Sequence, residues 1–366
     1  MNILIVGEFS AFAKHLKKGF QELGHNVVVV TKGDGFKKLD GDKEDIKYHI
    51  PKGVCNVSAT RFLIAPKENR MLRKKLEQLP LPDLIVVINV VFITDTLFTV
   101  GVPLSYIEDC KKKGTKVIST SCGGDPSVAY YHEIKYCKEK YPNGLYEYKR
   151  RHKKRFNRLL EDSDVIIPIG YDYYYSVNRY CQEHGISTKI SHSIPLPITI
   201  EDVEISSCVG RKIIIFHGII REDFKGTKYF ISALDRIKKD FPDKVEVIVD
   251  GKMPYDKYVD LLKRMDILLD QTNSYGMGIN AELGMMMGKV VFSGNEPENE
   301  DDMGLGKFPT INATPDSLYI YMKLKELINH PEKIDYLKQE SRNFAQAHLA
   351  ANVIALRYIK LINNNE

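Results

Sequence analysis

The most informative absences in this 366-residue sequence concern cysteine pairs and long apolar runs. No apolar run approaches the ~18 residues that a membrane-spanning helix requires, and the opening MNILIVG is too short for the core of a signal peptide. No C-x-x-C pair is present, which argues against a zinc site and against a disulfide framework. We therefore expect a reduced, cytoplasmic protein of enzyme size. The scattered cysteines are Cys55, Cys110, Cys122, Cys137, Cys181 and Cys208.

A strong charge imbalance and the common nucleotide-binding motifs are also lacking. The formal net charge is +5, from 53 basic and 48 acidic residues, which is too small to indicate a nucleic-acid partner. After the first apolar run the chain reads GEFSAF instead of G-x-G-x-x-G, and no acidic residue ends the second run, VVVVTKGDG. Both differences argue against NAD(P) chemistry, and the absence of G-x-x-x-x-G-K-[ST] excludes a P-loop.

What is present is an alternation of apolar strands and amphipathic helices. Residues 2–7 (NILIVG) are typical of a strand buried on both faces of a parallel sheet. Residues 11–24 have helical spacing, with Phe12, Leu16 and Phe20 on one face and lysines on the other. HNVVVVT completes a βαβ unit, and PDLIVVINVVFI, GTKVISTS and DSDVIIPIG repeat the strand pattern. The first half therefore predicts a doubly wound sheet.

A proline-containing segment, residues 192–210, separates this half from a second series of the same kind. In that series KIIIFHG, KVEVIVDG, MDILLDQ and GKVVFSG alternate with helical stretches. The sequence thus predicts an α/β protein with two Rossmann-like doubly wound domains that face each other across a cleft. Ligands of such sheets lie outside the carboxyl ends of the strands, so we expect the cleft to be the binding site.

The stretch IIIFHGIIREDFKGT, residues 213–227, has the features of an anion site. Gly218 follows an apolar strand and lets the backbone approach a ligand. Arg221, Lys225 and Gly226 come next, and a helix begins near Thr227, where its amides and dipole favour a negative group. A diphosphate is the expected ligand. The alternative is a solvated loop that carries two ordinary surface cations.

A second cluster lies in DQTNSYGMGINAELGMMMGKVV, residues 270–291. Gly276 and Gly278 loosen a loop after a strand, and Asn280 and Glu282 open the following helix. A carboxylate at the mouth of this domain can bind the two hydroxyls of a ribose, while free amides can bind phosphate or sugar oxygens. The three consecutive methionines that follow are expected to be helix core.

Two further positions are candidates for the opposite side of the cleft. Gly7 and Glu8 follow the first strand, and CGGD, which ends in Asp125, follows the strand GTKVISTS. Either carboxylate can contact an acceptor or a sugar hydroxyl. The alternative is that the glycines form turns and that Asp125 caps the next helix.

These residues resemble glycosyltransferases of the GT-B fold, in particular the retaining family 4 of bacterial surface-polysaccharide clusters. HGIIREDFKGTKYFISAL is similar to the Gly-Arg-…-Lys-Gly element of that family, and the resemblance implies that Arg221 and Lys225 hold the donor diphosphate. GINAELGMMMGKVV is similar to the stretch that carries the family's E-x7-E motif. Here Tyr275 stands at the first glutamate position, Leu283 at the second, and Glu282 one residue before it.

The resemblance implies transfer of a sugar from a nucleotide sugar to a hydroxyl of a glycan or lipid-linked acceptor, with retention and without a metal or other cofactor. It also implies an acceptor domain over residues 1–200, a donor domain over 209–348, and a C-terminal helix over 349–366 that crosses back to the first domain. For this helix we expect an apolar stripe formed by Val353, Leu356, Ile359, Lys360 and Ile362. The candidate catalytic residues are Arg221, Lys225 and Asp125.

Two other functions remain open at this point. A nucleotide-sugar 2-epimerase has the same architecture, and a non-catalytic subunit that binds a nucleotide sugar would explain the missing glutamates. The basic stretches at 148–162 and 68–79 are either solvated helix faces or surfaces for peripheral contact with the inner face of the cell membrane.

Overall fold

The computed structural model describes residues 1–33, 42, 44–48, 58–96, 99–134, 136, 153–199, 203–219, 221–251 and 255–363. Cys55, Cys137 and residues 148–152 of the basic stretch lie outside these ranges. Among the described residues no helix has both the length and the apolar character that a membrane crossing requires. The four described cysteines are buried and free.

The first half of the chain forms a parallel sheet with the strand order β3-β2-β1-β4-β7-β8. The chain starts in the middle of this sheet, moves to one edge through β2 and β3, and then returns to build the other side. Its elements are β1 (Asn2–Val6), α1 (Phe12–Glu22), β2 (Asn26–Thr31), β3 (Ile46–Lys47), α2 (Ser58–Glu77), β4 (Leu84–Val87), η2 (Val90–Phe92), β5 (Ile93–Thr94), β6 (Val102–Pro103), α3 (Leu104–Lys112), β7 (Lys116–Ser121), η3 (Pro126–Glu133), α5 (Lys153–Asp162), β8 (Val165–Pro168) and α6 (Tyr171–His184).

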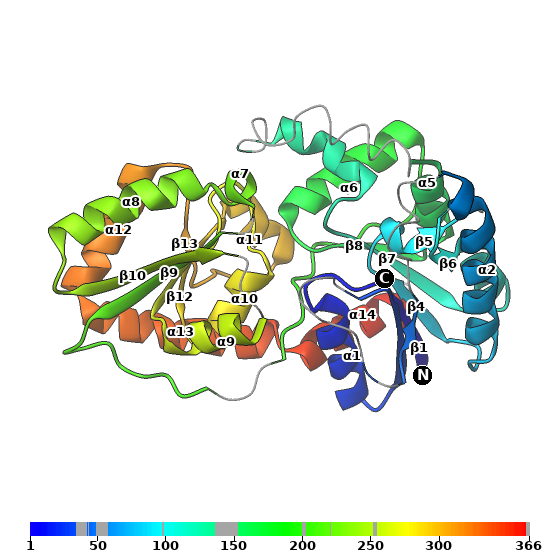
Figure 1. The fold of residues 1–366 in the computed structure, drawn as a ribbon, viewed down its shortest axis with the longest axis horizontal. Coiled ribbons are helices and arrows are strands. Elements are labelled where there is room, and N and C mark those ends of the chain that lie inside the picture. The colour runs from blue at the N-terminus through cyan, green and yellow to red at the C-terminus, as the bar shows by residue number, and fades with distance from the viewer. Residues whose placement is uncertain are drawn as a thin grey trace.

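The second half forms another parallel sheet, with the order β10-β9-β11-β12-β13. Figure 1 shows the two halves side by side, the second on the left and the first on the right. The elements are β9 (Ile213–Ile219), α7 (Glu222–Lys225), α8 (Thr227–Asp240), β10 (Val245–Gly251), α9 (Tyr255–Arg264), β11 (Ile267–Leu269), α10 (Ile279–Met286), β12 (Val290–Ser293), α11 (Pro297–Met303), β13 (Ile311–Asn312), α12 (Ser317–Asn329), α13 (Pro331–His348) and α14 (Ala351–Asn363).

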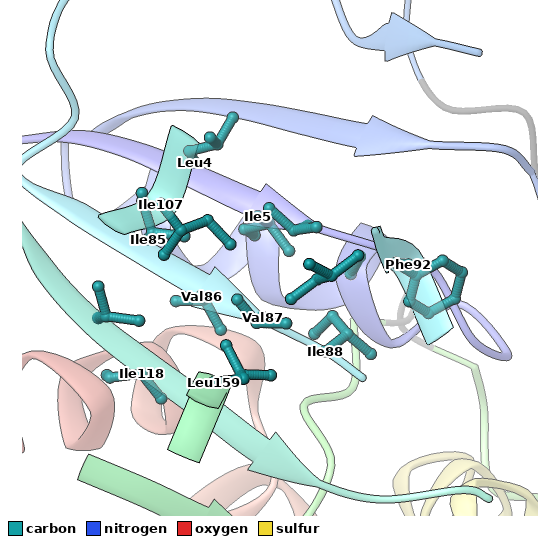
Figure 2. Close-up of a cluster of buried hydrophobic side chains, with 14 of the residues drawn as sticks. Leu4, Ile5, Ile85, Val86, Val87, Ile88, Phe92, Ile107, Ile118 and Leu159 are labelled. Atoms are coloured by element: carbon teal, nitrogen blue, oxygen red, sulfur yellow. The ribbon is translucent and has the colours of Figure 1, made fainter. Parts of the chain in front are cut away.

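The core of the first half explains why its strands are almost wholly apolar. Figure 2 shows side chains of β1, β4 and β7 packed with Ile107 of α3 and Leu159 of α5. The labelled β4 residues Ile85, Val86 and Val87 are fully buried, although successive side chains point to opposite faces of the sheet. Both faces are therefore covered, as the continuous apolar runs predict.

Alternate residues along the strands of the second sheet pack on opposite faces of the sheet. Ile213 and Ile215 of β9 pack with α8 and α12, whereas Phe216 packs on the other face with α10 and α13. Met285 and Met287 belong to this second cluster and are buried, which confirms that the methionine run is core. At 25 cal/mol per Å², each large buried side chain contributes about 1.5–3 kcal/mol to these cores.

The helix α14 packs against α1 of the first half, and Figure 1 shows it beside α1. Its buried face consists of Ala351, Ile354, Ala355 and Tyr358. The expected stripe is partly wrong: Ile359 and Ile362 pack against the core of the first half, but Leu356 is 42% exposed and Lys360 is exposed. The physical reason is close backbone packing: a Cβ atom on Gly19 of α1 would lie 2.0 Å from the carbonyl oxygen of Ala351.

Two segments cross between the halves, and they are hydrogen-bonded to each other. The amide of Ile198 donates to Leu349 O over 2.8 Å, and the amide of Ala351 donates to Ile198 O over 3.1 Å. The crossing before β9 and the crossing before α14 are thus tied together by a short parallel bridge.

The described parts of both basic stretches pack on the first half. In α5, Arg155, Phe156 and Leu159 are buried, and Arg158 pairs with Glu108. In α2, Arg73 donates to Glu77, Ser105 and Asp109. Several of the cations therefore have partners within the protein.

Candidate functional site

A cavity of about 390 Å³ lies between the carboxyl edges of the two sheets. Both halves of the chain contribute to its wall, as the cleft prediction requires. The first half provides Phe9, Ser10, Phe12, Cys122, Gly123, Gly124, Ile169, Gly170, Asp172, Tyr173 and Leu196. The second half provides Arg221, Phe224, Lys225, Gln271, Ser274, Gly276, Met277, Gly278, Ile279 and Asn280.

The wall of the second half is formed where its strand order reverses. The chain leaves β9 toward β10 on one side, and β11 lies on the other side of β9. β9 and β11 are neighbours, and the loops that follow them run in opposite directions. A crevice therefore opens between these two loops. Arg221 and Lys225 come from the first loop, and Gln271 from the second.

Gly226 connects two helices in the first of these loops. It ends α7 and begins α8 with φ +66°, a left-handed conformation that favours glycine. A Cβ atom here would lie only 2.0 Å from the hydroxyl oxygen of Thr272. The amide of Thr272 also donates to Lys225 O over 3.0 Å. Gly226 thus allows the two loops to meet, although it does not line the cavity.

Lys225 is buried in the cavity wall and forms an ion pair with Asp270. Its Nζ also lies 3.5 Å from Oε1 of Gln271. The other carboxylate oxygen of Asp270 accepts from the hydroxyl of Ser293 over 3.0 Å. Lys225 is therefore held in one place by the end of β11, because its ammonium group has a fixed anionic partner.

Arg221 is the more accessible of the two cations. Its side chain is exposed, and its guanidinium lies 4.4 Å from the centre of the Phe224 ring. Both residues line the cavity beside the N-terminus of α8. A guanidinium and an ammonium on one wall are a favourable environment for a phosphate or a diphosphate.

His217, in β9, contacts the first residue of α8. Its Nδ1–H donates to Leu269 O over 2.8 Å, so its Nε2 accepts from the hydroxyl of Thr227 over 2.9 Å. Burial lowers the pKa of His217 below its usual value, which favours the neutral ring that these two bonds need. The histidine of the motif is thus part of the support of the site.

The second predicted cluster also reaches the cavity in part. Gly276, Gly278 and Asn280 line it, and Gln271 Nε2 donates to Gly276 O over 2.9 Å. Tyr275 does not: it is 7% exposed, and its ring stacks on Tyr171 of the first half at 5.3 Å. Gly218 lies within β9 and does not line the cavity either.

Glu282 lies in a different place from the one expected. It is 1% exposed and does not line the cavity, so it is neither at the mouth of the domain nor an exposed helix residue. Its Oε1 accepts from the amide of Leu196 over 3.1 Å, and its Oε2 has no hydrogen-bond partner. Burial raises the pKa of this carboxyl well above its usual value. Glu282 therefore links α10 to the crossing segment.

Asp125 is fully buried, and the structure gives it the alternative role of a cap. Its Oδ1 accepts from the amide of Ser127 over 2.9 Å at the start of η3, and its Oδ2 accepts from the hydroxyl of Ser121 over 2.8 Å. The glycines before it, Gly123 and Gly124, line the cavity instead. The expected contact of Asp125 with the cavity is thus wrong, because its oxygens are directed into the turn.

Gly7 and Glu8 support the cavity without lining it. Gly7 has φ +102°, and a Cβ atom there would overlap the ring of Phe92. Glu8 is buried and accepts from the amide of Lys14 over 2.9 Å in the first turn of α1. Phe9, Ser10 and Phe12, which follow them, form the wall.

Sequence reasoning did not identify Asp172, which is buried at the cavity and contacts the second half. It occupies the first turn of α6, directly after the buried strand β8. An acidic residue at the start of a helix that follows a parallel strand was the available signal. In the described part of the chain, no group of three or more His, Cys, Asp or Glu side chains is placed to hold a metal ion.

The chain matches no family model and no curated protein. Its fold is nevertheless similar to solved structures over nearly the whole length. The lipopolysaccharide glycosyltransferase WaaG superposes with a TM-score of 0.62 at 12% identity, covering 100% of each chain. Anabaena HepE in complex with UDP superposes with a TM-score of 0.59 at 13% sequence identity. The match covers 99% of this chain and 100% of the HepE chain. UDP-GlcNAc 2-epimerase from Neisseria meningitidis, bound to UDP-GlcNAc, superposes with a TM-score of 0.50 at 15% sequence identity, covering 100% of each chain. The two Rossmann-like halves, the cavity between them and these similarities identify the architecture of this chain as the GT-B fold.

Proposed function

We propose that this protein is a glycosyltransferase that transfers a sugar from a nucleotide sugar to a hydroxyl of a glycan or lipid-linked acceptor in polysaccharide biosynthesis. The observation that carries this proposal is the wall formed by Arg221 and Lys225, which faces a cavity shared with the first half. A diphosphate is the group that such a wall binds best. The similar HepE structure contains UDP, and we extend that ligand to this chain as part of the proposal.

The proposed chemistry places the leaving diphosphate against Arg221 and Lys225. Negative charge develops on that group as the glycosidic bond breaks, and fixed cations and helix amides stabilise it without reorganisation. A metal ion is not needed in this proposal, because Arg221 supplies positive charge and the ammonium of Lys225, although paired with Asp270, has three N–H donors. Turnover that persists after treatment with a chelator would support this point.

In the same proposal the acceptor occupies the wall made by the first half. Phe9, Phe12 and Tyr173 provide apolar and aromatic surface there, and Gly123 and Gly124 leave room for a sugar ring to approach the backbone. We propose retention of configuration at the anomeric carbon. Analysis of the product linkage tests the stereochemistry directly.

A thermal-shift screen against UDP-, GDP-, ADP- and CMP-sugars tests the proposal as a whole. A ligand that binds only the folded state stabilises it by RT ln(1 + [L]/Kd), or about 2.7 kcal/mol at a hundredfold excess over Kd. The proposal expects one nucleotide series to raise Tm and requires a new glycosidic product when acceptors are added. No shift with any of the four series would contradict it.

An epimerase is the second candidate, favoured by the similarity to UDP-GlcNAc 2-epimerase. An epimerase converts the donor when no acceptor is present, whereas a transferase releases product only with an acceptor. Incubation with donor alone and analysis of the sugar separates the two. Tight donor binding without turnover in either assay would instead indicate a non-catalytic subunit.

We further propose a cytoplasmic location with peripheral contact to the inner membrane face, where a lipid-linked acceptor would lie. Lys153 and Lys154 at the start of α5 are exposed and can contribute to such a contact. Co-sedimentation with anionic and with neutral vesicles tests this, since only the anionic vesicles are expected to retain the protein.

A further inference from the structure

We propose that Asp172, which belongs to the first half, is a positioning residue for the nucleotide-binding loop of the second half. This loop, Ser274 to Gly276, is part of the cavity wall and leads to α10. The nature of the ligand rests on the proposed function. The contact between Asp172 and the loop does not, and it can be tested without any ligand.

The carboxylate of Asp172 is buried and accepts several hydrogen bonds from the loop. Its side chain accepts from the hydroxyl of Ser274 over 2.5 Å, from the amide of Tyr275 over 3.1 and 3.0 Å, and from the amide of Gly276 over 3.3 Å. Asp172 is only 5% exposed. A buried carboxylate that accepts from successive backbone amides fixes their orientation, because each unpaired amide would carry its full desolvation cost.

The opposite side of the same loop is fixed by the second half itself. Gln271 Nε2 donates to Gly276 O over 2.9 Å. A Cβ atom on Gly276 would lie 2.6 Å from Oδ1 of Asn299, so α11 packs directly on the loop backbone. Gly276 is therefore held between Gln271 of its own half and Asp172 of the other.

The position of Asp172 in its helix suits this role. It lies in the first turn of α6, which runs over 14 residues, and the helix dipole favours a negative charge there. Tyr171, the residue before it, stacks on Tyr275 with ring centres 5.3 Å apart. The start of α6 thus contacts the loop through one charged and one aromatic side chain.

It follows that the loop has its ligand-binding shape only when the first half is in contact with it. A residue more than 100 positions away in the sequence, whose carboxylate is hydrogen-bonded to the loop, would then set nucleotide affinity. The general mechanism is preorganisation, because a loop that is already ordered loses less entropy when the ligand binds.

Asp302 of α11 is a matched control for Asp172. Its carboxylate also crosses between the halves, where the amide of Ser193 donates to it over 3.4 and 3.3 Å. Its hydrogen bonds among the described residues go to His192 and Ser193 and not to the loop, and it does not line the cavity. Asp302→Asn therefore perturbs the same interface and leaves the loop contacts in place.

The experiment compares wild type, Asp172→Asn and Asp302→Asn as full-length proteins. Amide hydrogen exchange without ligand should show Tyr275 and Gly276 protected in wild type and in Asp302→Asn, and exchanging faster in Asp172→Asn. Calorimetric titration with UDP should show about a tenfold or larger loss of affinity for Asp172→Asn. For Asp302→Asn we expect less than about a threefold loss. In turnover assays the donor KM should rise while the acceptor KM stays unchanged.

Two results would overturn the inference. If the amides of Tyr275 and Gly276 exchanged as slowly in Asp172→Asn as in wild type and Asp302→Asn, Asp172 would not hold the loop. Fast exchange in Asp172→Asn with UDP affinity within twofold of wild type would leave Asp172 a purely structural residue. Ser274→Ala removes one contact and should change affinity in the same direction if Asp172→Asn fails to fold. If wild type bound no nucleotide, the proposed function would fail, and the exchange measurement alone would still decide the loop contact.

Discussion

Lys225 and Asp270 form a buried ion pair in the wall of the cavity, so a cation expected to meet a phosphate already has an anionic partner. Both side chains are almost inaccessible, at 7% and 1% of their surface. The pair joins the loop after β9 to the end of β11. It has consequences for stability as well as for binding.

For this pair we expect Lys225→Ala to destabilise the fold. Removal of one partner leaves a buried, uncompensated carboxylate, at a cost of about 3–5 kcal/mol. The double variant Lys225→Ala/Asp270→Asn should recover part of this loss, since the buried charge is gone. Denaturant unfolding of the two variants measures the difference. Equal stability of single and double variants would contradict a buried, charged pair.

Arg221→Ala should affect ligand binding and leave stability unchanged. The side chain is exposed, lines the cavity and has its ring contact with Phe224 of the same loop. Loss of one charge-assisted contact to a phosphate should weaken UDP binding by about ten- to a hundredfold. Lys228→Ala removes an exposed cation in the first turn of α8 that does not line the cavity, and it serves as the control. Calorimetry that shows equal UDP affinity in wild type and Arg221→Ala would remove this residue from the site.

Glu282→Gln should change the pH dependence of stability. Burial raises the pKa of this carboxyl in the folded state, so the folded protein binds more protons than the unfolded chain at pH values between the two pKa values. The stability of wild type then falls as pH rises through that window, and the glutamine variant lacks this term. The Tm of Glu282→Gln relative to wild type should rise as the pH increases above the usual glutamate pKa of about 4.3. Parallel Tm curves for the two proteins would show that the raised pKa has no effect on folding.

Tyr358→Ala should destabilise the protein through the contact between α14 and α1. Tyr358 is fully buried and lies edge-on to Phe20, with ring centres 6.3 Å apart. A large-to-small change at such a site costs about 3–5 kcal/mol. Leu356→Ala in the same helix is the control, since Leu356 is 42% exposed. Equal unfolding midpoints for the two variants would mean that α14 does not contribute its buried face to the fold.

Much of the architecture could be predicted from local patterns. Strands β1, β2, β9 and β12 coincide with apolar runs, and α1 buries the face formed by Phe12, Leu16 and Phe20. The loop that carries Arg221 and Lys225 lies at the carboxyl edge of its sheet, where the pattern places it. These features depend on side-chain period and on glycine conformation, which are properties of a short segment.

The contacts of the site could not be predicted in the same way. Glu282 has its partner in Leu196, 86 residues earlier, and Asp172 has its partners more than 100 residues later. Spacing within one segment carries no information about such partners. The stripe of α14 is partly wrong for the same reason, because the position of α1 decides which residues of α14 are fully buried.

The sequence by itself therefore determined the two α/β halves, their order and the loop that bears the cations, since backbone and packing preferences act over a few residues. Only the tertiary structure decided which polar side chains reach the cavity. Asp125 caps the start of η3, Glu282 is buried against the crossing segment, and Asp172 contacts the second half. The physical reason is that a buried polar group must find a hydrogen-bond partner, and that partner is supplied by whichever segment the fold brings next to it.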